Sequence, residues 1–254
     1  GLERFRRPMH NLQMERLVPC AYQRDNAVTM HDDLLHSFKN LPLDAENLLR
    51  GLLHLQSFSA GEMIFLQGSE PTAVYLVANG RVKVVRVTPE GYESILCVRG
   101  PGDYLCPVPL LDNGTHLGSA VTMSDVVLFS IDQKDFVHLC QTSPDFLATV
   151  QGDCLSEVRR LLNRLEGFAF RGVKQRLAIA LTDECRRQRY NESNPNELLL
   201  TQQELAGLIG ASRESVSRNM VKMEKDGIVQ LGRGRVTITD WERLTHLTGE
   251  NPTD

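Results

Sequence analysis

A run of short β-rich segments separated by glycine turns is the feature that most constrains the fold of this chain. Between residues 56 and 132 the segments AVYLVA, RVKVVRV, ESILCV, AVTM and DVVLFSI are divided by turn signals such as Asn79-Gly80, Glu90-Gly91 and Asn113-Gly114. Short strands at near-regular spacing, joined by glycine turns, indicate an antiparallel sandwich or barrel. We therefore expect a β-barrel over residues 34–142, preceded by an arm at 1–33. The leucines between Leu34 and Leu55 have helical spacing, with Asp44 as an N-cap.

Composition narrows the classes of function. The chain has 254 residues and a net charge of −4, which excludes a protein that coats nucleic acid through bulk positive charge. No apolar run approaches the ~18 residues of a membrane span, and no secretory signal begins the sequence, so a cytoplasmic protein without membrane contact is expected. Six cysteines without a CxxC pair argue against structural zinc and favour reduced thiols. No GxSxG, HExxH or P-loop string is present, so we do not expect an enzyme.

Residues 143–170 predict one long helix followed by a hinge. Ser143 is a natural N-cap, and Pro144 suits the first turn. Apolar side chains then recur at heptad spacing, with Gln151 as a polar exception. The set is Leu147, Cys154, Val158, Leu161, Leu165 and Phe168. Such a 3.5-residue stripe is typical of the seam of a two-stranded coiled coil and predicts a homodimer. Packing against the chain's own barrel is the alternative, and the segment GFAFRG is the expected hinge.

Residues 171–254 predict a winged helix-turn-helix. GVKQRLAIALTDECRRQR reads as an amphipathic helix, and YNESNPNE reads as a polar loop. Thr201 with Glu204 three residues later forms a capping box, Gly210 permits a left-handed turn, and Ser212 caps a second helix. The expected buried face of that helix is Val216, Met220 and either Met223 or Ile228. DGIVQLGRGRVTIT then reads as a two-stranded wing.

The second helix carries side chains that we expect to contact the bases of DNA. Arg213, Glu214, Ser217 and Arg218 lie on its first turns, opposite Val216. Arginine donates two bonds to guanine O6 and N7, and glutamate accepts from cytosine N4. Residues 212–235 contain six Lys or Arg against three acids, so the basic patch is local. The expected phosphate contacts are Ser212, Lys222, Arg233 and Arg235. A surface helix whose charges are only solvated is the alternative.

With these motifs the chain resembles the cAMP receptor protein/FNR family of bacterial transcription regulators over roughly residues 34–245. The resemblance is carried by SRESVSR at 212–218, by the Gly102-Asp103 turn of the barrel, and by the long helix and hinge. It implies an α+β chain with a cyclic-nucleotide-binding-like β-barrel (a jelly roll), a long dimerisation helix and a C-terminal winged helix-turn-helix. It also implies a homodimer on near-palindromic double-stranded DNA with TGA-type half-sites, and recruitment of RNA polymerase. An architectural DNA-binding protein is the rival, against which the acidic balance and the barrel argue.

Departures from the family pattern bear on the effector. Where cAMP-binding members place a Gly-Glu pair and then an Arg-Ser pair on the cyclic phosphate, this chain has Cys106-Pro107 and Gly118-Ser119. Without that arginine a buried phosphate lacks its charge partner, so the sequence argues against cAMP. Cys20 is the only cysteine of the arm, which argues against a [4Fe–4S] cluster ligated with Cys97 and Cys106.

Haem is the leading candidate for the effector. Carbon-monoxide-sensing members place a cysteine ligand of haem iron where Cys106 stands, and Leu161, Leu162 and Leu165 would form an apolar wall for the porphyrin. Those members have a histidine two residues later, where this chain has Val108. A second axial ligand would come from the N-terminal arm, for example His10 or His31, or from the arm of the partner subunit. Cys106 as a plain buried residue is the alternative.

Other modes of control stay open. Another small molecule, a thiol switch, or activity without a ligand would each suit the sequence. A thiol switch would use Cys97 and Cys106, or Cys154 on the seam, although apolar packing is the preferred role of Cys154.

Overall fold

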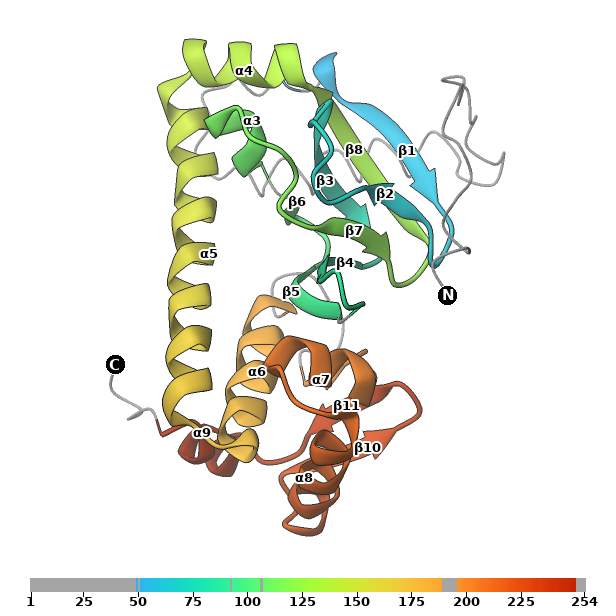
Figure 1. The fold of residues 1–254 in the computed structure, drawn as a ribbon, viewed down its shortest axis with the longest axis vertical. Helices are drawn as coiled ribbons and strands as arrows, with labels where there is room; N and C mark the ends of the chain where they lie inside the picture. The colour runs from blue at the N-terminus through green and yellow to red at the C-terminus, as the bar shows by residue number, and fades with distance from the viewer. Residues whose placement is uncertain (1–48, 50, 92, 106, 189–195, 250–254) are drawn as a thin grey trace.

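The structure is a computed structural model that describes residues 49, 51–91, 93–105, 107–188 and 196–249. Two four-stranded antiparallel sheets form its N-terminal unit (Figure 1). One sheet has the order β1-β8-β3-β6 and the other β2-β7-β4-β5. The strands are β1 (His54–Phe58), β2 (Met63–Phe65), β3 (Ala73–Asn79), β4 (Val82–Val87), β5 (Glu93–Arg99), β6 (Tyr104–Leu105), β7 (Ser119–Thr122) and β8 (Val126–Asp132). The expected antiparallel sandwich is therefore confirmed.

Apolar side chains between and around the sheets form the core of this unit. Val77, Val82, Ala120 and Leu128 fill the space where the two sheets face each other. A second cluster joins the outer side of β3 and β8 to the helices α3 (Val108–Asp112) and α4 (Gln133–Thr142). At the Asn79-Gly80 turn, Gly80 has φ +83°, and a Cβ there would lie 2.3 Å from the carbonyl oxygen of Asp125. Glycine is therefore required at this turn.

Several local expectations about this unit were wrong or incomplete. The helical spacing was expected to continue to Leu55, but strand β1 begins at His54, and Leu55 pairs with Phe129 of β8. Strand pairing with β8 thus outweighs the helical spacing of the leucines. Strand β2 and the helices α3 and α4 were not predicted. The arm at 1–33, with Cys20, His10 and His31, lies outside the described residues, as do Asp44 and Cys106.

Helix α5 (Pro144–Phe170) is the longest element and runs down one side of the molecule (Figure 1). Ser143 accepts a hydrogen bond from the amide of Phe146, and Pro144 occupies the first turn, so the predicted start is confirmed. Its buried side chains near this end are Phe146 and Val150, which pack on the core under α4. The helix continues to Phe170, so most of the expected GFAFRG hinge is helical. Only residues 171–172 separate it from α6 (Val173–Gln188).

The C-terminal unit contains α6, α7 (Gln202–Ile209), α8 (Arg213–Lys225) and α9 (Trp241–Thr248) around a three-stranded sheet of order β10-β11-β9. Its strands are β9 (Glu197–Leu198), β10 (Val229–Gly232) and β11 (Arg235–Ile238). Glu197, which was expected to end a polar loop, instead pairs with Thr237 of β11. Helix α9 was not predicted. The helix-turn-helix and its wing lie where the sequence predicts them.

The two units share one hydrophobic cluster. Val85, Ile95 and Val98 of the β4–β5 hairpin pack with the buried residues of α6, α7 and α8. A Cβ on Gly207 of α7 would approach the side chain of Ile95 to 3.0 Å. The guanidinium of Arg164 on α5 donates to the carbonyl oxygens of Ile95 and Leu96 on β5 and of Leu208 on α7. The sheet that contains β5 and the helix-turn-helix are therefore in direct contact.

Candidate nucleic-acid interface

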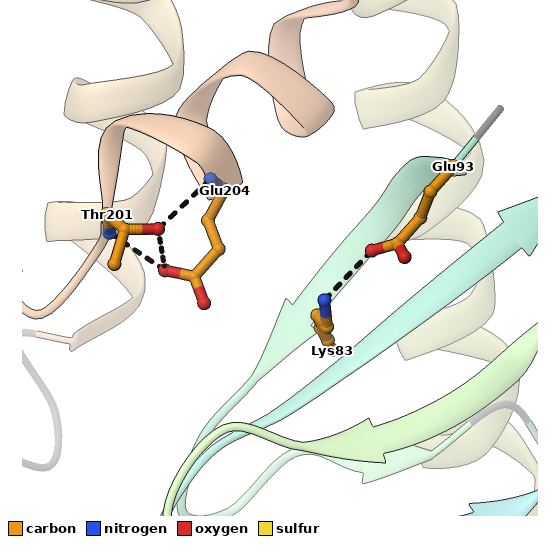
Figure 2. A network of polar contacts seen from close by, with 4 residues as sticks. All are labelled: Lys83, Glu93, Thr201 and Glu204. Carbon is orange, nitrogen blue, oxygen red and sulfur yellow. Dashed lines mark hydrogen bonds and ion pairs between the residues drawn. The ribbon is translucent and has the colours of Figure 1, made fainter. Parts of the chain in front are cut away.

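Helix α7 is fixed at both ends by the residues that the sequence indicated. The hydroxyl of Thr201 accepts from the amide of Glu204 at 3.2 Å, and the Glu204 carboxylate accepts from the amide of Thr201 at 2.8 Å. Figure 2 shows this capping box beside the β4–β5 hairpin, where Lys83 and Glu93 form an ion pair of 2.8 Å. Gly210 ends the helix with φ 58° and ψ 50°, which is left-handed backbone. These bonds set the tight turn between α7 and α8.

Helix α8 begins at the predicted cap and buries the predicted face. Ser212 accepts a hydrogen bond from the amide of Ser215 at 3.2 Å. Val216, Met220 and Met223 are all buried, and Ile228 beyond the helix is buried as well. The sequence left Met223 and Ile228 as alternatives, and both belong to the core.

The side chains expected to read bases share the outer face of α8. Arg213, Glu214 and Arg218 are exposed, and Ser217 is half-buried. Arg218 donates to the hydroxyl of Ser215 at 3.3 Å, which leaves most of its guanidinium donors directed at solvent. Figure 1 shows α8 at the end of the molecule opposite α4.

Among the side chains expected to hold phosphates, Lys222 lies on α8 and Arg233 at the wing turn, and both are exposed. Arg235, also exposed, forms an ion pair of 3.2 Å with Glu197 on the adjacent strand. This partner was not foreseen, and a phosphate would have to compete with it. The carboxylate of Glu224 accepts from the amide of Leu231 at 2.9 Å and so joins α8 to the wing. One of the three acids of the patch therefore has a structural role.

Helix α5 presents an exposed apolar stripe on its outer side. Leu155, Val158, Leu162 and Leu165 are spaced three, four and three residues apart, with exposed fractions of 62, 50, 58 and 64%. Leu155 was missed in the sequence, although its spacing to Val158 and Leu162 fits the same heptad pattern.

The rest of the predicted seam is less uniform. Leu161 is exposed, whereas Leu147 and Cys154 are half-buried. Phe168 stays 45% exposed, but it also contacts its own chain, because the Arg176 guanidinium lies 5.2 Å from its ring centre.

The residues that the sequence analysis named for binding an effector lie in different parts of the structure. Gly118 has no room for a side chain, since a Cβ there would lie 2.7 Å from the carbonyl oxygen of Val85. The Ser119 hydroxyl accepts from the amide of Gln67 at 2.9 Å. Leu161, Leu162 and Leu165 belong to none of the buried clusters of the barrel. Within the described ranges, no group of three or more His, Cys, Asp or Glu is placed to hold a metal ion. The same part of the chain contains no helix suited in length and hydropathy to cross a membrane.

Comparison with known proteins matches both units. Residues 55–143 match the cyclic nucleotide-binding domain, and residues 175–247 match the Crp-like helix-turn-helix domain. A CRP-like cAMP-activated global transcriptional regulator of Mycobacterium tuberculosis is 30% identical over 189 residues, covering 74% of this chain and 84% of the relative. The Cyclic AMP receptor protein of Thermus thermophilus is 29% identical over 210 residues, covering 83% and 95%. The structure of FixK2 from Bradyrhizobium japonicum has a TM-score of 0.69 at 18% identity, covering 77% and 96%.

The fold, the capped helix-turn-helix and the matches to the two family domains agree with the resemblance seen in the sequence. The family consists of transcription regulators and not of enzymes. The chain belongs to the CRP/FNR family of DNA-binding transcription regulators.

Proposed function

We propose that the chain acts as a homodimer that reads a near-palindromic DNA site through α8. The observation that carries the proposal is the exposed polar outer face of this capped helix, which lies at the end of the molecule opposite α4. Arg213, Glu214, Ser217 and Arg218 read base edges in the major groove. Ser212, Lys222, Arg233 and Arg235 hold the phosphates, helped by the partial positive charge of the helix N-terminus.

Two substitutions on α8 separate base reading from phosphate binding. Arg218→Ala should weaken binding to the preferred site by roughly 5- to 150-fold, corresponding to about 1–3 kcal/mol, and relax the preference at one base. Lys222→Ala should weaken binding to all sequences alike. It should also reduce the slope of the logarithm of the binding constant against the logarithm of the salt concentration by about one. Fluorescence anisotropy with sites enriched from a random DNA pool measures both effects. Lys134→Ala on α4 is the control, because this exposed lysine lies at the other end of the molecule. Wild-type binding by both α8 variants would contradict the assignment of the recognition helix.

The partner in the proposed dimer is a second copy of α5. One side of α5 is held to its own chain by Phe146, Val150 and the Arg99–Glu157 ion pair of 2.9 Å. The other side presents the apolar stripe of Leu155, Val158, Leu162 and Leu165, which suits an identical helix. A shift of the paired helices would set the spacing of the two recognition helices to about one DNA turn, ~34 Å. Recruitment of RNA polymerase and action in the cytoplasm complete the proposal.

We further propose that the barrel senses an effector other than cAMP. The relatives from M. tuberculosis and T. thermophilus are named for cAMP. In this chain the position that would carry the phosphate-binding arginine is Gly118, where the backbone of Val85 leaves no space for a side chain. The cyclic phosphate would then lack its charge partner.

The proposed division of the chain into domains is an arm at 1–33, the barrel at 34–142, the dimer helix at 143–170 and the DNA-binding domain at 171–254.

Haem through Cys106 stays a prediction, and the described residues give it no support. Leu161, Leu162 and Leu165 are 41, 58 and 64% exposed and do not form a wall against the barrel. An absorption spectrum before and after dithionite, with and without CO, tests the prediction. A Soret band that shifts with both would support it, with Cys106→Ala as the next variant. Broad absorbance near 400 nm that bleaches in air would instead indicate an iron–sulfur cluster, and a colourless protein that ignores added haem would leave another small molecule, a thiol switch or ligand-free activity.

Among these alternatives, a thiol switch at Cys154 is disfavoured. Burial, together with the negative charge of Asp153, raises the pKa of the Cys154 thiol. A raised pKa lowers the fraction of the reactive thiolate, so apolar packing remains the preferred role of this residue.

A further inference from the structure

The side chain of Ser215 connects the N-cap of α8 to one of the expected base readers. The Ser212 hydroxyl donates to the Ser215 hydroxyl at 3.0 Å, and the guanidinium of Arg218 donates to the same oxygen at 3.3 Å. Residues three apart in a helix lie on one face, so the three side chains form a row along the outside of α8. Ser215 was not among the base readers or the phosphate contacts expected from the sequence.

The hydrogen bonds of Ser215 are divided between its backbone and its hydroxyl. Its amide donates to the Ser212 hydroxyl at 3.2 Å, and this bond is the cap of α8. Its hydroxyl oxygen accepts from Ser212 and from Arg218, which uses both lone pairs of that oxygen. The cap therefore uses no side-chain atom of Ser215, whereas the contact with Arg218 depends entirely on the hydroxyl.

The side chain of Arg218 has few other restraints. It is exposed, and among the described residues it hydrogen-bonds to Ser215 and forms no ion pair. An arginine side chain loses rotamer freedom when it binds a base edge, and a guanidinium that is already oriented loses less. Arg213, the other arginine of this face, has no such contact within the described ranges. The contact with Ser215 therefore distinguishes Arg218 from its neighbour.

We propose that Ser215 is a positioning residue, which orients the guanidinium of Arg218 before DNA binds. The inference rests on the proposed reading of DNA by α8. It adds that the preference at the base pair contacted by Arg218 depends on a second residue that need not touch this base pair. The competing role of Ser215 is a direct phosphate contact, since a hydroxyl near a helix N-terminus can donate to a phosphate oxygen. That role would affect all DNA sequences equally.

Binding of the full chain to its preferred site and to every single-base-pair variant of that site, measured by fluorescence anisotropy, separates the two roles. Ser215→Ala should weaken binding to the preferred site by roughly 2- to 12-fold, the range for one hydrogen bond. The loss should be concentrated at the base pair where Arg218→Ala also loses its preference. Ser215→Thr keeps a hydroxyl and should restore most of that preference. Ser57→Ala, at an exposed serine of β1, is the matched control and should bind as the wild type does.

The double variant shows whether Ser215 acts through Arg218. In the Arg218→Ala background, Ser215→Ala should change the affinity by less than about twofold, because no guanidinium remains to be oriented. Equal losses in the two backgrounds, or an unchanged base preference in Ser215→Ala, would overturn the proposal. Alanine keeps the amide that binds Ser212 and has a higher helix propensity than serine, so the melting temperature of Ser215→Ala should not fall.

The same measurements distinguish failure of this role from failure of the proposed function. Weakened binding by Arg218→Ala together with a wild-type base preference in Ser215→Ala would remove only the role of Ser215. Wild-type binding by Arg218→Ala would overturn the reading of DNA by α8 and the role of Ser215 with it.

Discussion

Replacement of Leu162 by serine tests the proposed dimer at the middle of the α5 stripe. Leu162 is 58% exposed in the single chain, so the change creates no cavity in the monomer, whose unfolding free energy should shift by less than about 0.5 kcal/mol. Complete burial of a leucine side chain stabilises by about 1.5–3 kcal/mol. The share of Leu162 that a partner would newly cover is therefore worth about 1–2 kcal/mol per copy.

Both copies carry the substitution, so the dimer should lose about 2–4 kcal/mol, or roughly 30- to 700-fold in its dissociation constant. Sedimentation equilibrium over a concentration series measures this constant directly. Leu199→Ser is the matched control, because Leu199 is 49% exposed but lies outside α5. Equal association of Leu162→Ser and the wild type would refute the seam. Equal weakening by the control would show that the contact lies elsewhere.

Three further substitutions test contacts within one chain. Arg164→Leu removes the bonds from α5 to the carbonyl groups of β5 and α7. Urea unfolding should show a loss of about 1.5–3 kcal/mol, the range for a hydrogen bond to a charged group. Ser212→Ala removes the cap of α8 and should lower the free energy of unfolding by about 1 kcal/mol, measured by thermal denaturation. Burial lowers the pKa of His116, which stacks on Phe65 at 3.8 Å, so the folded state favours the neutral ring. The wild type should therefore lose stability as the pH falls below about 6.5, the usual pKa of histidine. The variant His116→Phe should lose less stability over the same pH range. Parallel curves of stability against pH for the two proteins would contradict this reasoning.

Features of the fold set by neighbouring residues could be predicted from the sequence. The capping box at Thr201 and Glu204, the left-handed turn at Gly210 and the cap at Ser212 each depend on side chains within a few residues. The same holds for the face of α8 that carries Arg213 and Arg218.

Features set by distant partners were missed. His54 to Phe58 form a strand because β8 pairs with them, and nothing in their own spacing of leucines indicates it. A pocket lined by β5, α5, α6 and α7 is formed by elements that are far apart in the chain, so no local sequence pattern predicts it. Leu155 is the exception, because its heptad spacing was present in the sequence.

Because of the hydrophobic cluster that they share along β5, the two units are not independent modules. Val85, Ile95 and Val98 belong to the N-terminal unit by sequence but to the core of the DNA-binding unit by packing. A DNA-binding segment cut out at residue 171 would leave the face of α7 that meets Ile95 open to water. Exchange of this segment between family members would therefore require the β4–β5 hairpin to be exchanged with it, and the two units should melt in a single cooperative transition.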